Sequence, residues 1–184
     1  MHTMLGTLLR QLFGSRQPRG HQLALWGRVM KALPDAAITV VSVTDRSNRV
    51  RIASALAASG ADPAQVTIRG ALPTAEFWRI REDIDIVLDA FPYNGTTTCD
   101  ALWAGLPVIT LPGSHGAARS SASLLTAIGL TQLVAKDAVD YIAIAENLAR
   151  DVDQLAALRA GMRQRMLDSG LCDGTAFTRE LESL

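Results

Sequence analysis

Cysteine, aromatic residues and net charge are all scarce in this chain, and each scarcity excludes a class of protein. The two cysteines, Cys99 and Cys172, do not make a disulfide framework and match no metal-binding spacing. Aromatic residues make up 5% of the chain, too few for a stacking platform that binds single-stranded nucleic acid. Basic and acidic residues are balanced at 18 each. We therefore expect no binding to nucleic acid or to an anionic membrane surface.

Long hydrophobic runs are missing as well. No segment approaches the roughly 20 consecutive apolar residues that a membrane-spanning helix needs. The apolar N-terminal residues are interrupted by Arg10 and Gln11, and no small-residue cleavage site follows, so we expect no signal peptide. With 48% hydrophobic residues the chain still has ample material for a core. These features favour a cytoplasmic protein with reduced cysteines.

Short apolar runs alternate with helical patterns along the chain. The runs predict strands at 38–43, 66–68, 84–88 and 108–111, and the segments between them predict helices at 22–33, 50–59 and 99–104, with another that starts at Thr74. Three further helices, at 117–128, 137–149 and 152–167, form a C-terminal helical segment. The sequence therefore predicts the α/β class, a Rossmann-like parallel sheet flanked by helices. Residues 1–20 are expected to be a divergent N-terminal segment, and residues 21–184 the Rossmann-like domain with its closing helices.

A threonine-rich turn follows the third predicted strand and carries the candidate chemistry. Asp89 ends the strand, Asn94-Gly95 forms a tight turn, and the three threonines 96–98 precede a helix. The free N–H groups and partial positive charge of a helix N-terminus, with hydroxyls from Thr96 and its two neighbours, suit a diphosphate. Asp100 is placed to accept hydrogen bonds from ribose hydroxyls. An ordinary threonine-capped helix remains the alternative, because neither a Walker loop nor a GxGxxG motif is present.

The same region resembles the nucleotide-sugar-binding half of the protein O-GlcNAc transferase and SPINDLY family, which has the glycosyltransferase-B (GT-B) fold. The resemblance extends from about Leu23 to the end of the chain, and its most specific part is the FPYNGTTTC…LWAGLPV core. The matching stretches are LWGRVMKALPDA (25–36), DIDIVLDAFPYNGTTTCDALWAGLPVITLPG (83–113), ARSSASLLTAIGL (118–130), LVAKDAVDY (133–141), LRAGMRQRM (158–166) and LCDGTAF (171–177). The resemblance implies that this half binds a UDP-sugar, usually UDP-GlcNAc, and that hydroxyl-bearing proteins receive the sugar. It implies no cofactor and no metal, since the UDP-sugar is a substrate.

The resemblance also assigns roles to individual residues. Thr97 and Thr98 match residues that contact the diphosphate, and Asp100 matches an acidic residue at the ribose. Leu72 matches a position whose backbone meets the uracil. Phe77 falls where the family can place a ring against the base, although simple packing of an amphipathic helix explains that residue equally well.

Four departures from the family pattern bear on activity. The threonine turn is one residue shorter than the usual form. Gly116 occupies the place of a loop histidine, with His115 adjacent as a candidate substitute. Residues 14–22 contain no counterpart of a lysine that stabilises the leaving diphosphate, and Arg16 or Arg19 would be an unequal replacement. The acceptor-side half of the fold and its catalytic histidine are not in this sequence.

These departures leave three hypotheses open. In the first, the chain is the donor-binding half of an O-GlcNAc-transferase-like enzyme from a truncated or split gene, inactive without the other half. A separate N-terminal half or a protein acceptor is then a candidate partner. In the second, it is a non-catalytic interaction or nucleotide-binding module that keeps the Rossmann-like fold but not useful donor affinity. In the third, it is a Rossmann enzyme for another nucleotide or phosphorylated ligand. The response to UDP separates the first from the second.

Overall fold

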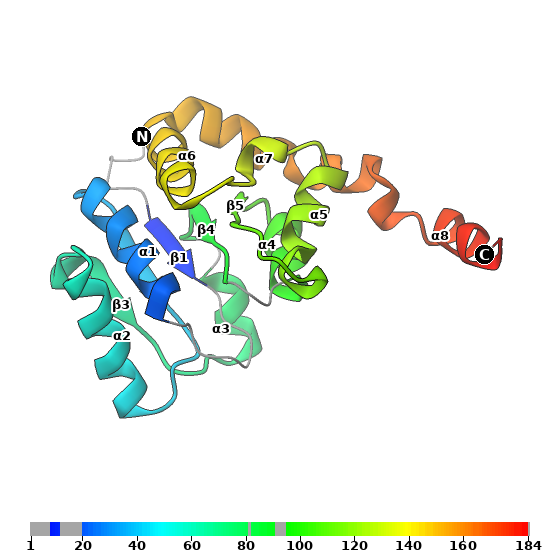
Figure 1. Ribbon diagram of the computed structural model, residues 1–184. Helices are drawn as coiled ribbons and strands as arrows, with labels where there is room; N and C mark the ends of the chain where they lie inside the picture. Colours follow the sequence, from blue (N-terminus) through cyan, green and yellow to red (C-terminus); the bar gives the residue numbers. More distant parts are fainter. Residues whose placement is uncertain (1–7, 12–19, 81, 91–94, 184) are drawn as a thin grey trace.

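Five parallel strands form one sheet at the centre of the molecule (Figure 1). The computed structural model describes residues 8–11, 20–80, 82–90 and 95–183. The strand order is β3-β2-β1-β4-β5, the order of a doubly wound nucleotide-binding sheet. The strands are β1 (Leu8–Gln11), β2 (Ala37–Val40), β3 (Val66–Ile68), β4 (Ile86–Leu88) and β5 (Val108–Ile109). The predicted fold class is confirmed.

Helices cover the sheet and continue beyond it. They are α1 (Gly20–Ala32), α2 (Arg46–Ala58), α3 (Thr74–Arg79), α4 (Thr96–Trp103), α5 (Ser120–Ala127), α6 (Ala138–Arg150), α7 (Val152–Asp168) and α8 (Gly174–Glu182). Helix α1 packs on α2 and α6, and α4 packs on α5 and α7. Each helix predicted from the sequence is present, with boundaries shifted by a few residues. The largest shift is at α2, which begins four residues before the predicted start because the side chain of Asp45 caps it.

The central strand β1 comes from the segment that the sequence analysis set apart as residues 1–20. It pairs with β2 on one side and with β4 on the other. Its sequence LLRQ has only two apolar residues, which is too short a pattern to indicate a strand. The pairing with its neighbours identifies it instead, so part of this segment lies within the sheet.

The core is continuous from α1 through the sheet to the C-terminal helices. Leu23, Trp26 and Met30 are fully buried on one face of α1, at helical spacing. On α7, Leu155, Met162 and Met166 are buried, which confirms most of the predicted apolar stripe; the fourth member, Leu158, is half-buried and packs against the core. This stripe fixes α7 against the rest of the domain.

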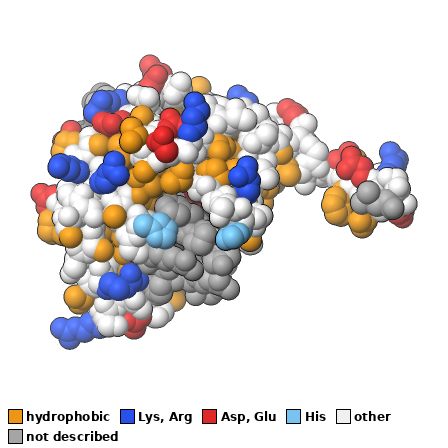
Figure 2. All heavy atoms as spheres, viewed as in Figure 1, with side chains coloured by type: hydrophobic (Ala, Val, Ile, Leu, Met, Phe, Trp, Pro, Cys, Tyr) orange, Lys and Arg blue, Asp and Glu red, His pale blue; other side chains and the backbone are white. Residues whose placement is uncertain are grey.

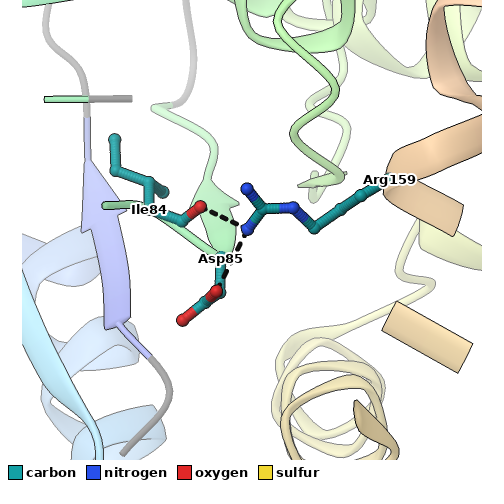
Figure 3. A network of polar contacts seen from close by, with 3 residues as sticks. All are labelled: Ile84, Asp85 and Arg159. Atoms are coloured by element: carbon teal, nitrogen blue, oxygen red, sulfur yellow. Dashed lines mark hydrogen bonds and ion pairs between the residues drawn. The ribbon is translucent and has the colours of Figure 1, made fainter. Parts of the chain in front are cut away.

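Two arginines of α7 donate hydrogen bonds to backbone carbonyls of the segments on which the helix packs. Arg159 donates to the carbonyl of Ile84 and, at 3.0 Å, to the carboxylate of Asp85, just before β4 (Figure 3). Arg163 donates to the carbonyl of Trp103 at the end of α4 and lies over its indole ring, 4.9 Å from the ring centroid. Both arginines therefore help to hold β4 and α4, which lead into and out of the threonine turn.

Helix α8 projects from the body of the domain (Figure 1). It has no buried residue, and its apolar side chains Phe177 and Leu181 are 64% and 59% exposed. Figure 2 shows this projecting segment with hydrophobic atoms on its surface. None of the helices in the described part of the chain is long and apolar enough to cross a membrane.

Candidate functional site

The carboxyl edge of the sheet between β1 and β4 is the place where the strand order reverses. In open parallel sheets this switch point is where ligands bind. Asp89 directly follows β4 at this edge, and its backbone N–H donates to the carbonyl of Ile109 in β5 (2.9 Å). The buried amide of Gln22, in the first turn of α1, donates to the carbonyl of Asp89 at 3.3 Å. The ends of β4 and β5 and the start of α1 thus lie together here.

Helix α4 begins at this edge without a side-chain cap. The N-cap is Gly95, and the first helical hydrogen bond runs from the N–H of Cys99 to its carbonyl (2.9 Å). The N–H groups of residues 96–98 come before that bond and carry the positive end of the helix dipole. The prediction that the threonines precede the helix is wrong, because they form its first turn. The N–H groups on which the predicted anion site depends are therefore those of the threonines themselves, and the site stays a prediction.

The backbone conformation at position 95 requires a glycine. Its φ angle is +136°, a region that side chains rarely adopt. A Cβ atom at this position would also lie 3.3 Å from the Cβ of Ser120, at the start of α5. The glycine therefore allows the starts of α4 and α5 to approach closely.

The predicted residues of this turn differ in exposure. Thr96 is exposed, and Thr97 and Asp100 are half-buried, so all three are accessible to a ligand. Thr98 is only 1% exposed. Its hydroxyl lies 2.7 Å from the hydroxyl of Ser121 and donates to Asp89 at 3.4 Å. The Thr98 hydroxyl thus points into the protein, and its N–H is the group it can offer to a diphosphate.

The other predicted residues lie outside this turn. His115 is exposed and is the N-cap residue of the 3₁₀ turn η2 (Gly116–Ala118), without a side-chain cap bond. Leu72 is half-buried against the core, which leaves its backbone as the group for a base contact. Phe77 belongs to α3, but its side chain lies outside the described residues, as do Arg16 and Arg19. The roles assigned to these residues stay predictions.

A set of buried polar side chains lies behind the turn and was not predicted from the sequence. Thr110 follows β5 and donates from its hydroxyl to Asp89 at 2.7 Å. Asp89, Thr110 and Ser121 are 3%, 0% and 0% exposed. The sequence held a signal for two of them, since Asp89 and Thr110 each close an apolar strand at the carboxyl edge where sites gather. Ser121 had no such signal, because it looks like any serine near the start of a helix.

An aromatic pair lies nearby. Tyr141 in α6 and Trp26 in α1 are both fully buried. Burial raises the pKa of the Tyr141 hydroxyl, the negative charge of Asp89 raises it further, and the indole N–H of Trp26 acts in the opposite direction. Tyr141 therefore stays protonated and neutral.

The described residues contain no group of three or more His, Cys, Asp and Glu side chains that could hold a metal ion. The expectation that no metal takes part stays a prediction.

The chain is similar in sequence to known proteins. Residues 11–181 match the sequence profile of Glycosyl transferase family 41. The chain is 39% identical over 168 residues to the "Probable UDP-N-acetylglucosamine--peptide N-acetylglucosaminyltransferase SPINDLY" of Oryza sativa subsp. japonica, covering 88% of this chain and 18% of that protein. It therefore spans about a fifth of the length of that relative.

Solved structures agree with the sequence match. The Thermobaculum terrenum O-GlcNAc transferase, as its K341M mutant, superposes with a TM-score of 0.85 at 32% identity, over 97% of this chain and 35% of that one. Anabaena Alr3699/HepE, solved in complex with UDP and glucose, superposes with a TM-score of 0.68 at 11% identity, over 98% of this chain and 49% of that chain, which shows the fold alone. The neighbours are glycosyltransferases of the GT-B fold, so this sheet belongs to one Rossmann-like half of that fold. The chain belongs to glycosyl transferase family 41, with O-GlcNAc transferase and SPINDLY among its relatives.

Proposed function

We propose that this chain is the donor-binding half of a protein O-linked N-acetylglucosaminyltransferase-like enzyme, which holds a UDP-sugar with UDP-GlcNAc as the expected donor. The observation that carries the proposal is the start of α4: a glycine N-cap without a side-chain cap, at the switch point of the sheet. Family membership supports a nucleotide sugar as the ligand, because its relative SPINDLY is named for UDP-N-acetylglucosamine.

The chemistry of sugar transfer requires charge stabilisation at this place. When the bond between the sugar and the diphosphate breaks, negative charge develops on the departing UDP. The N–H groups of residues 96–98 and the dipole of α4 stabilise that charge without having to reorganise. Asp100, one turn inside the helix and half-buried, accepts hydrogen bonds from the ribose hydroxyls in this arrangement. The chain thus supplies donor binding and leaving-group stabilisation.

Transfer itself needs more than this half. A glycosyltransferase must hold the acceptor hydroxyl in line with the donor, which contributes much of the rate through positioning. We propose that an acceptor-side half supplies this function, and that the chain by itself binds the donor without transferring the sugar. Addition of an acceptor peptide to the isolated chain with UDP-GlcNAc is expected to give no glycopeptide by mass spectrometry.

A thermal unfolding series with UDP, UDP-GlcNAc, GDP-fucose and ADP tests donor binding. A ligand present at 100 times its dissociation constant stabilises the native state by about 2.7 kcal/mol, so the melting temperature is expected to rise with UDP and UDP-GlcNAc. Asp100→Ala should reduce that rise. The matched control is Asp153→Ala, which removes an exposed carboxylate from the first turn of α7 and should leave the rise intact. No response to any nucleotide at millimolar concentration would leave the non-catalytic interaction module as the better hypothesis.

A further inference from the structure

Four buried polar side chains from four segments meet behind the start of α4. Asp89 follows β4, Thr98 lies in the first turn of α4, Thr110 follows β5, and Ser121 lies in the first turn of α5. Each is at most 3% exposed. We refer to them as the Asp89 network. The starts of two helices that both lack a side-chain cap are therefore joined through it.

The direction of the hydrogen bonds in the network follows from its chemistry. An ionised carboxylate only accepts, so the hydroxyls of Thr110 (2.7 Å) and Thr98 (3.4 Å) both donate to Asp89. The hydroxyls of Thr98 and Ser121 lie 2.7 Å apart, and either of them can be the donor. The network connects the start of α5 with the start of α4 and with the end of β4.

A buried polar network of this kind stabilises a core no better than apolar side chains do. Burying a carboxylate costs free energy that its hydrogen bonds only offset, and apolar side chains of similar volume often serve stability as well or better. Hydrogen-bond geometry, however, fixes the position of its members more sharply than apolar contact does. A positioning role at the adjacent helix start is therefore the better explanation of the buried charge.

We propose that Asp89 is a positioning residue that sets where the diphosphate-binding N–H groups of α4 lie relative to α5. The inference rests on the proposed function, because it assigns a purpose to the same helix start. Thr98 links the network to the turn that also carries Thr96 and Thr97, whose side chains are accessible. A break in the network lets this turn shift, which disturbs phosphate contacts while the base and ribose contacts stay in place.

Titration calorimetry of the full chain with UDP and with uridine tests this inference. Uridine keeps the base and ribose and lacks the diphosphate. The variants are Asp89→Asn and Ser121→Ala, and the matched control is Ser123→Ala, which makes the same change at an exposed position of α5. The network variants are expected to weaken UDP binding by about tenfold or more and to leave uridine binding within about twofold; the control should change neither. Thr110→Ser, which keeps the hydroxyl, should retain UDP affinity better than Thr110→Val.

The outcomes separate the inference from the proposed function. If the unmodified chain does not bind UDP, the proposed function fails and the inference fails with it. If the unmodified chain binds UDP but the network variants keep its affinity, only the inference is overturned. Equal losses for UDP and uridine would also overturn it, because they show a general loss of structure. Circular dichroism checks that each variant is folded, and Ser121→Ala, which keeps the carboxylate, decides the matter if Asp89→Asn does not fold.

Discussion

The N-caps of helices α6 and α7 are aspartates whose carboxylates accept hydrogen bonds from the first turn, whereas the N-cap of α4 is a glycine. Asp137 accepts hydrogen bonds from the N–H groups of Val139 (2.8 Å) and Asp140 (2.9 Å) at the start of α6. Asp151 does the same for Gln154 (2.8 Å) in α7. Gly95 offers no side chain to α4. Helix α5 also begins without a side-chain cap, as does the six-residue helix α3.

The capped starts contribute stability, whereas the uncapped start of α4, at the switch point of the sheet, is the one for which we propose a ligand. A carboxylate cap contributes about 0.5–2 kcal/mol and occupies the free N–H groups. Helix α4 forgoes that contribution at the carboxyl edge of the sheet, where ligands bind in folds of this type. The same N–H groups then remain for an anion. Substitutions at the capped and uncapped helix starts test this contrast.

Gly95→Ala should disturb the start of α4 most. The residue has a φ of +136°, and a Cβ would lie 3.3 Å from the Cβ of Ser120. Strain of this kind costs about 1–3 kcal/mol, so chemical denaturation should show a loss of that size together with weaker UDP binding. Gly161→Ala in α7 is the matched control, because nothing lies within 4 Å of its added Cβ, and it should stabilise the protein by about 0.5–1 kcal/mol. Unchanged stability and UDP affinity in Gly95→Ala would contradict the claim that the start of α4 depends on this glycine.

Asp137→Ala should affect stability alone. The substitution removes the two cap bonds at the start of α6, which are worth about 1 kcal/mol. The free energy of unfolding is expected to fall by that amount in a urea titration, with the UDP affinity unchanged. A loss of UDP affinity as large as that of Gly95→Ala would show that the two helix starts are not distinct in function.

The Asp45 cap of α2 should stop contributing to the stability of the folded state at acid pH. Hydrogen bonds from the side chain and the backbone N–H of Asn48, and then from Ser47, lower the pKa of Asp45 from 3.8 to about 2. Because the pKa is lowered in the folded state, the stabilisation is present above the unfolded value and is lost as the pH falls through about 2. The stability difference between the unmodified chain and Asp45→Ala should therefore be constant near neutral pH and shrink below pH 3.8. A difference that stays constant down to pH 2 would contradict this origin of the cap.

The smallest effect concerns the thiol of Cys99, near the start of α4. Burial raises its pKa, and the charge of Asp100 and the nearby Cys172 raise it further. Less thiolate is then present at pH 8, so Cys99 should react with a maleimide more slowly than the exposed Cys172. Peptide mapping by mass spectrometry after timed labelling gives both rates. Faster labelling of Cys99 would mean that the helix dipole outweighs burial at this position.

The sequence predicted those parts of the fold that local patterns encode. Apolar runs and helical spacing located β3 at its observed bounds, and β2, β4 and β5 within a few residues. Strand β1 was not predicted, because its pairing with β2 and β4 defines it and no local sequence pattern shows that pairing. In the same way, the polar turn before α4 pointed to the site, but the contact of Thr98 with Ser121, 23 residues away, exists only in three dimensions.

The central claim is that the open start of α4 binds the diphosphate of a UDP-sugar, and amide NMR tests it most directly. In a ¹⁵N-labelled chain titrated with UDP, the N–H signals of residues 96–98 should move strongly and saturate together. The N–H signals of Val139 and Asp140, which are bonded to the Asp137 cap, should stay in place, and uridine should move the threonine signals far less than UDP does. UDP binding that shifts other amides and leaves residues 96–98 unmoved would contradict the account.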